Sequence, residues 1–86
     1  MTTIKQVIPK WFNGTIYEQG EEVQNRFSGE SIELTAEELS MYDFVMGATM
    51  MMETSGFGGA KLAGDLRKGL NWFRKNNPEA YMVLLD

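Results

Sequence analysis

The pattern of apolar and polar positions changes character near Thr35. Before this residue, apolar side chains come in short clusters separated by turn-forming residues, which is typical of short strands. After it, apolar side chains recur every three or four positions, which indicates helices. The sequence therefore predicts an α+β fold in one small domain, residues 1–86. N-terminal β-hairpins are expected in residues 1–34, followed in residues 35–86 by two α-helices and a short C-terminal helix.

Two β-hairpins are predicted in the first part of the chain. Asn13-Gly14 stands between Trp11-Phe12 and Thr15-Ile16-Tyr17. Asn-Gly between β-prone residues favours a type I′ turn, in which both central positions have positive φ. The second hairpin is expected to have strands at residues 23–27 and 32–34 and a turn at residues 28–31.

Three helices are predicted in the second part. Thr35 and Glu38 have the spacing of a capping box, in which a hydroxyl and a carboxylate bond the free amides of the first helical turn. Asn77-Pro78-Glu79 has the residue types of another helix start, with Asn as N-cap. The apolar stripe of the second helix consists of Leu62, Leu66, Leu70 and Phe73. The expected helices run from about 36 to 53, from about 60 to 76 and from 78 to about 85.

The first predicted helix is apolar on nearly every side, apart from a small or polar strip of Ala36, Ser40, Asp43 and Gly47. Such a helix should be buried on most sides, and an 86-residue chain has little material to cover it. The helix also holds four methionines within seven residues, and methionine adapts to irregular partner surfaces. We therefore expect a homo-oligomer; the alternative is that the whole helix is monomer core. The residues predicted for self-association are Tyr42, Val45, Met46, Met50 and Met52.

The formal net charge of −4 conceals two regions of opposite sign. Residues 18–43 hold eight acidic residues and one arginine, a net charge of −7. Residues 61–75 hold five basic residues and one aspartate, a net charge of +4. We expect the two regions to face each other, either within one chain or across a dimer.

The residue content argues against catalysis. The chain has no histidine and no cysteine, so the commonest general base, metal ligands and the thiolate nucleophile are missing. Asp43 lies within the apolar helix, where burial would raise its pKa, or on the small polar strip facing water. The glycine-rich residues 55–61 lack the spacing of a phosphate-binding loop and fit a connector between helices. We therefore predict no enzyme activity and no catalytic, cofactor-binding or metal-binding residue.

Two regions are candidate surfaces for a partner: the acidic hairpin region, or a basic face on the second helix. The basic face consists of Lys68, Trp72, Arg74 and Lys75. The indole could stack on a base while the cations contact phosphates, which makes a weak nucleic-acid-binding protein an alternative function. Against it, the chain is acidic overall, and Trp72 is also placed to pack beneath the N-terminal hairpins under lysine stems.

Four stretches carry a resemblance that spans most of the chain: WFNGT at 11–15, FSGE with ELTAEE at 27–38, MYDFVMG at 41–47 and WFRKNNPEAY at 72–81. The chain resembles a group of small uncharacterised proteins encoded by contractile-tailed phages that infect marine cyanobacteria. The group has no established activity, so the resemblance implies no functional residue. It implies a setting, either the cytoplasm of an infected bacterium or the virion.

No membrane association is expected. Residues 1–5 lack the apolar block of a secretory signal, and the longest apolar-rich stretch, residues 41–52, is shorter than the roughly 20 residues of a membrane-spanning helix. The expected function is a non-enzymatic interaction protein that binds a host or phage protein. A minor structural component of the virion is the remaining alternative.

Overall fold

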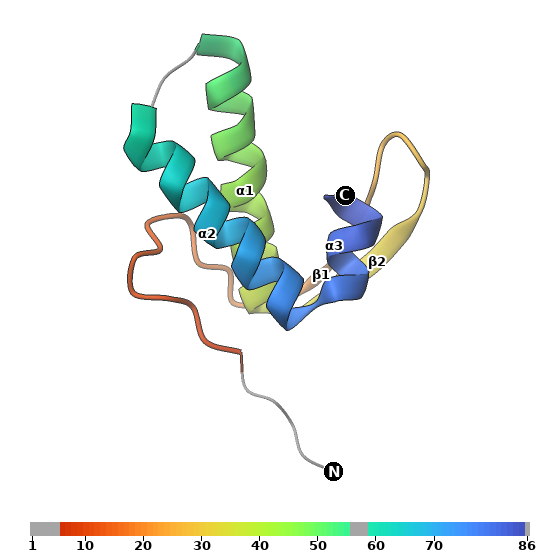
Figure 1. Ribbon diagram of the computed structural model, residues 1–86. Helices are drawn as coiled ribbons and strands as arrows, with labels where there is room; N and C mark the ends of the chain where they lie inside the picture. Colours follow the sequence, from red (N-terminus) through yellow and green to blue (C-terminus); the bar gives the residue numbers. More distant parts are fainter. Residues whose placement is uncertain (1–5, 56–58, 86) are drawn as a thin grey trace.

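The computed structural model describes residues 6–55 and 59–85 and shows a two-stranded antiparallel hairpin followed by three helices (Figure 1). This confirms the predicted α+β class. The predicted helices are confirmed within two residues at each end. The elements are β1 (Glu21–Gln24), β2 (Ser31–Leu34), α1 (Ala36–Ser55), α2 (Gly59–Asn76) and α3 (Pro78–Leu84).

The β1–β2 hairpin is the second of the two predicted hairpins, with its strands displaced toward the N-terminus. Val23 pairs with Ile32, and β1 ends at Gln24, so Phe27 lies in the connecting loop and not in a strand as predicted. The cause is Asn25, whose Oδ1 accepts hydrogen bonds from the backbone N–H of Phe27 (2.8 Å) and of Ser28 (3.3 Å). This Asx-type turn starts the loop earlier than a turn at residues 28–31 would.

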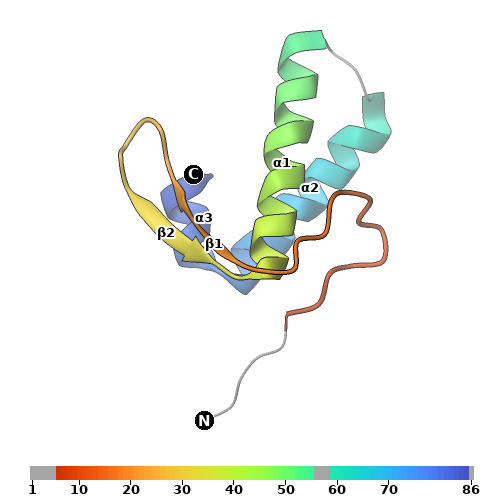
Figure 2. The same ribbon diagram turned by 180° about the vertical axis from the view of Figure 1, so that it is seen from behind.

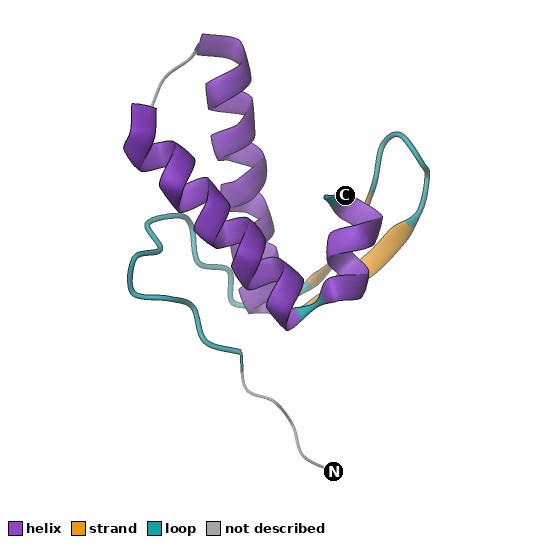
Figure 3. Cartoon of the chain, in the orientation of Figure 1, coloured by secondary structure: helices purple, strands orange, loops and turns teal. Residues whose placement is uncertain are grey.

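The first predicted hairpin is wrong. Residues 6–20 contain no strand and cross the α1–α2 pair as an extended loop (Figure 3). The rings of Trp11 and Phe12 contact Phe44 of α1 edge-to-face, with centroids 5.8 and 5.6 Å away. An isolated two-stranded hairpin is only marginally stable, and these rings bury more surface by covering α1.

Gly14 serves this packing and not a type I′ turn. Across the described part of the chain, positive φ occurs only at Gly29 and Gly59. A Cβ atom at Gly14 would lie 2.8 Å from the ring of Phe12, so glycine permits the close approach.

The core lies where α1 and α2 cross and where α3 packs beside them. On α1, Met41, Val45 and Ala48 share one face with the 4-3 spacing of a buried helical stripe, and all are buried. Phe73 of α2 is fully buried and is the largest such side chain among the described residues. Ala80 and Leu84 of α3 join the same cluster together with Leu34 of β2.

Glu38 joins three distant parts of the chain although only 3% of the residue is exposed. The predicted capping box is present, because the Thr35 N–H donates to Glu38 Oε1 (3.0 Å) and the Glu38 N–H to Thr35 Oγ1 (3.2 Å). The other carboxylate oxygen, Oε2, accepts from Gln6 Nε2 (2.6 Å) and from Asn77 Nδ2 (3.1 Å). Asn77 is also the N-cap of α3, as predicted, and its Oδ1 accepts from the Ala80 N–H (3.1 Å).

The molecule is flat, with extents of 43 × 32 × 21 Å. A thickness of 21 Å corresponds to two layers of helix at roughly 10 Å each. The far ends of α1 and α2 extend beyond the hairpin and α3 (Figures 1 and 2). The chain therefore covers two sides of α1, one with α2 and one with the N-terminal loop.

None of the helices in the described ranges is long and apolar enough to cross a membrane.

Candidate functional site

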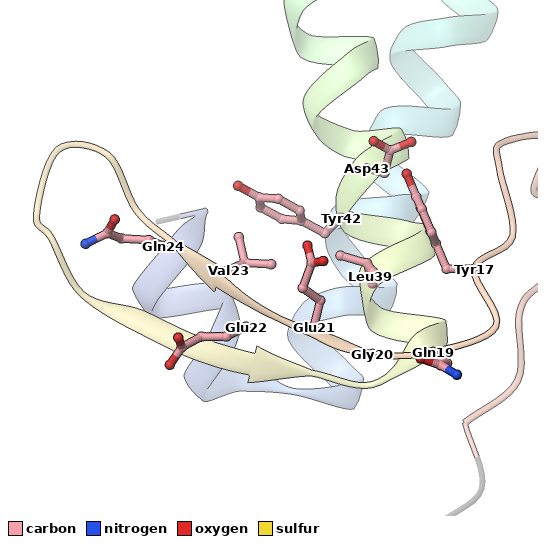
Figure 4. Close-up of a pocket in the computed structure, with 10 residues that line it drawn as sticks. All are labelled: Tyr17, Gln19, Gly20, Glu21, Glu22, Val23, Gln24, Leu39, Tyr42 and Asp43. Carbon is pink, nitrogen blue, oxygen red and sulfur yellow. The ribbon is translucent and has the colours of Figure 1, made fainter.

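A hollow lies between β1, its preceding loop and the first turns of α1 (Figure 4). It has a volume of about 610 Å³. Val23 and Leu39 supply apolar contact surface, and the Glu21 carboxylate rises toward Leu39 and Tyr42 in Figure 4. The lining residues are Tyr17, Gln19, Gly20, Glu21, Glu22, Val23, Gln24, Leu39, Tyr42 and Asp43. We call this feature the acidic hollow.

Gly20, which directly precedes β1, lies against the backbone at the end of β2. A Cβ atom at Gly20 would lie only 2.0 Å from the backbone oxygen of Leu34. A side chain at this position would therefore force the backbone apart. Glycine at position 20 thus sets the path by which the chain enters β1 and places Glu21 over α1.

Tyr17 and Asp43 face each other across the rim of the acidic hollow (Figure 4). The negative charge of Asp43 raises the pKa of the Tyr17 phenol above its usual value, and lost hydration and a hydrogen bond to Asp43 raise it further. Asp43 itself is exposed, so of the two placements considered for it the water-facing one is confirmed.

Within the small polar strip on α1, Gly47 is exposed like Asp43, but Ser40 is not. Ser40 is fully buried, because the N-terminal loop covers it. Its Oγ donates to the Ala36 carbonyl (2.8 Å) and accepts from the Tyr17 N–H (2.9 Å). These bonds anchor Tyr17, and thus its ring, beside the acidic hollow.

The acidic residues of the hollow make no ion pair with the basic helix in the described ranges. The salt bridges found there join Asp65 to Lys61 (3.2 Å) and to Lys68 (4.0 Å), all within α2. Of the two arrangements expected for the oppositely charged regions, pairing within one chain is therefore not observed. Pairing across copies, or with a partner, stays a prediction.

The residues predicted for self-association do not all reach the surface. Val45 is 1% exposed and packs against Gly69 of α2. The prediction that Val45 takes part in self-association is therefore wrong, because this side chain belongs to the core of the monomer. Met52 and Tyr42 are half-buried, whereas Met46 and Met50 are 41% and 62% exposed. Positions 42, 46 and 50 are one helical turn apart, so these three side chains share one side of α1. Because Tyr42 also lines the acidic hollow, we call Met46 and Met50 the methionine face.

The predicted basic face is largely engaged within the chain. The Trp72 Nε1–H donates to the Val7 carbonyl (3.0 Å), and Trp72 is half-buried on the core. Lys68 Nζ lies 5.8 Å from the centroid of the Trp11 ring. The guanidinium of Arg74 lies 5.7 Å from the Tyr81 ring, while Lys75 is exposed. The expectation that Trp72 packs beneath the N-terminal segment is thus confirmed, although that segment is a loop.

The glycine-rich segment, predicted as a connector between helices, is described only in part. Its residues 56–58 lie outside the described residues, and Lys61 bonds Asp65 one turn further along α2. Within the described ranges, no three acidic side chains are grouped in a way that would hold a metal ion.

Comparisons with known proteins give no functional assignment: no family model, curated protein or solved structure matches this chain. Sequence reasoning predicted the acidic hairpin region as one of two possible partner surfaces, but it did not identify the hollow that this region forms with α1. Tyr42 and Asp43 of α1 lie far along the chain from Glu21 of β1, and these groups meet only because β1 lies beside α1. The one available signal was the excess of acidic residues between positions 18 and 43.

Proposed function

We propose that this protein is a non-enzymatic interaction protein of the phage type, which self-associates through α1 and binds a host or phage protein. One observation carries the proposal: a side of α1 that α2 does not cover presents a hollow and exposed methionines. The acidic hollow, with Leu39, Tyr42 and Asp43, occupies its first turns. Exposed Met46 and Met50 follow toward the far end.

The two parts of this surface suit different partners. Methionine side chains are flexible and polarizable, and apolar burial between two copies of the methionine face favours association. The acidic hollow combines carboxylates with tyrosine rings, a lining that complements lysine or arginine side chains. We therefore assign the methionine face to the second copy and the acidic hollow to a basic segment of the partner protein. The proposed setting is the infected bacterial cytoplasm or the virion, on the resemblance described above.

Self-association is tested by light scattering on the purified protein. We expect an oligomer at high micromolar concentration and a smaller assembly, of lower molar mass, for the Met46→Glu, Met50→Glu double variant, with an unchanged circular dichroism spectrum. Ile16→Glu is the control, because Ile16 is 65% exposed on the N-terminal loop and its replacement should leave the oligomer intact. A strict monomer for the parent protein contradicts this half of the proposal.

The partner is sought by affinity capture from infected-host lysate with matched charge reversals. Asp43→Lys reverses a charge on the rim of the acidic hollow, and Glu53→Lys reverses an exposed charge near the far end of α1. A protein that binds the acidic hollow is lost with Asp43→Lys and retained with Glu53→Lys. Identical capture by both variants contradicts a role for the hollow.

The two alternative functions keep their own tests. Nucleic-acid binding predicts quenching of tryptophan fluorescence by single-stranded DNA at low salt. It receives less support from the geometry, because Trp72 and Lys68 are engaged with the N-terminal loop. A structural role in the phage particle predicts the protein in purified virions, which mass spectrometry detects.

A further inference from the structure

Phe27, at the tip of the β1–β2 hairpin, is 100% exposed. The tip that presents it is well ordered by hydrogen bonds. The Asn25 N–H donates to the Glu30 carbonyl (2.8 Å), the Gly29 N–H donates to the Asn25 carbonyl (2.9 Å), and Gly29 adopts the left-handed conformation that closes the loop (φ 79°). The Phe27 ring is thus held out into water, where an apolar side chain forgoes the free energy of burial.

A second hollow lies beside this tip, between the hairpin loop and α3. Its volume is about 550 Å³, within the range of about 300–1,000 Å³ typical of small-ligand sites and ample for one aromatic ring. Pro78, Met82 and Val83 give it a mainly apolar lining, and Met82 is 68% exposed. Glu30 and Glu79 also line it. We call this feature the α3 hollow.

Asn25 fixes the position of the exposed ring relative to the α3 hollow. While its Oδ1 bonds the Phe27 N–H (2.8 Å), its Nδ2 donates to the carbonyl of Val83 (2.8 Å) in the wall of the hollow. The hairpin and α3 lie side by side in both ribbon views (Figures 1 and 2). A protruding ring and a receptive hollow are therefore held on neighbouring parts of one surface, which is the arrangement that a two-fold contact requires.

The charges around these two features are also complementary. Arg26, next to Phe27, is exposed and is the single basic residue between positions 18 and 43. The α3 hollow carries the carboxylates of Glu30 and Glu79. The salt bridges of the described residues are those of Asp65, so Arg26 and these glutamates have no ion-pair partner within the described chain.

We propose that Phe27 of one copy inserts into the α3 hollow of a second copy, and that the second copy does the same in return. Phe27 then packs on Met82, Val83 and Pro78 of the other chain, and Arg26 lies beside the other chain's Glu79. Each copy supplies one ring and one hollow, so the contact closes as a two-fold dimer. This contact is independent of the methionine face on α1, and where both operate the protein forms assemblies larger than a dimer.

A photo-cross-linking amino acid at position 27 tests the contact directly. With p-benzoylphenylalanine in place of Phe27, irradiation should give a covalent dimer linked to Met82 or its neighbours in α3. Mixing isotope-labelled and unlabelled protein shows by mass spectrometry that the link joins two chains. The same amino acid in place of Val7, which is also exposed (66%), should give no link to α3. A link confined to one chain, or no link to α3, overturns the proposal.

A charge exchange provides a second test that does not depend on aromatic packing. Arg26→Glu and Glu79→Arg should each weaken the dimer, whereas the double variant restores the opposite charges and should recover most of the affinity. Phe27→Ser should weaken it about tenfold or more. These measurements use the Met46→Glu, Met50→Glu background, so a failed contact at Phe27 is distinguished from a failed contact on α1. Additive losses without recovery in the double variant contradict the proposed pairing.

Discussion

At the scale of single residues, Glu38 is the point where three segments meet. Its carboxylate accepts hydrogen bonds from the start of α1, from Gln6 in the N-terminal loop and from Asn77 at the start of α3. Truncation leaves these donors without their charged acceptor in a buried site. Glu38→Ala should lower the free energy of unfolding by about 3 kcal/mol. Urea denaturation measures the loss, and Glu33→Ala on the exposed side of β2 is the matched control with little expected effect. Equal effects of the two substitutions would refute this role.

The pair of Tyr17 and Asp43 makes a second residue-scale prediction. Because the Asp43 charge is the main reason that the pKa of Tyr17 is raised, Asp43→Asn should move this pKa down toward its usual value of about 10. The hydrogen bond to Asp43 forms only with the protonated phenol of Tyr17. Its contribution to the stability of the folded protein is therefore present below pH about 10 and is lost as the pH rises through the raised pKa of Tyr17.

Ultraviolet absorbance of tyrosinate during alkaline titration measures this shift. Subtracting the curve of Tyr17→Phe isolates Tyr17 from Tyr42 and Tyr81. Glu53→Gln, at an exposed position near the other end of α1, should leave the Tyr17 titration where it is. An unchanged midpoint in Asp43→Asn would show that the two groups do not interact in solution.

These two residues also show how far sequence reasoning reaches. Thr35 and Glu38 are three positions apart, and a capping box depends only on local geometry, so this role was predictable. Gln6 and Asn77 become partners of Glu38 only when the chain has folded, and no local pattern marks them. The same holds for Tyr17, which reaches Asp43 because Ser40 fixes its backbone.

At the scale of elements, two glycines of α2 have opposite roles. A Cβ atom at Gly64 would meet open space, whereas one at Gly69 would lie 3.1 Å from Val45 Cγ2 and 3.3 Å from Met41 Sδ. Gly64→Ala should therefore stabilise the protein by about 1 kcal/mol, because alanine is the better helix former.

Gly69→Ala should stabilise the protein less than Gly64→Ala does, or destabilise it. Gly69→Val should lower the free energy of unfolding by about 1–3 kcal/mol, because α1 and α2 can then no longer approach as closely. Thermal unfolding followed by circular dichroism ranks the three variants. An equal gain from alanine at both positions would mean that α1 and α2 do not pack closely at Gly69.

Elements with strong local signals were predicted well, and those that depend on tertiary contacts were not. α1 and α3 begin at recognisable caps, and α2 carries a period-3.6 apolar stripe, so the approximate bounds of the helices follow from the sequence. The Asn13-Gly14 hairpin fails because Trp11 and Phe12 gain more by covering Phe44 than a lone hairpin would give them. Phe27 was expected in a strand because the competing turn depends on one side chain, that of Asn25.

At the scale of the whole molecule, the short chain covers α1 only in part. We expected a second copy to cover α1 because apolar residues lie around nearly the whole circumference of this helix. In the structure, α2 covers one side of α1 and the N-terminal loop covers part of another. The acidic hollow and the exposed methionines lie on the remaining surface of α1. The question of a partner thus narrows from the whole helix to one face.

The salt dependence of assembly decides which surface joins the copies. Apolar contact through the methionine face is insensitive to ionic strength. Pairing of the acidic region with the basic helix of another copy is instead weakened by salt, because the Debye length falls from about 10 Å at 0.1 M to about 3 Å at 1 M. In the Phe27→Ser variant, which leaves α1 as the proposed contact, we expect the dimer dissociation constant to change by less than about threefold over this range. Sedimentation equilibrium at several sodium chloride concentrations measures it. A steep rise of the dissociation constant with salt would place the oppositely charged regions, and not Met46 and Met50, at the interface.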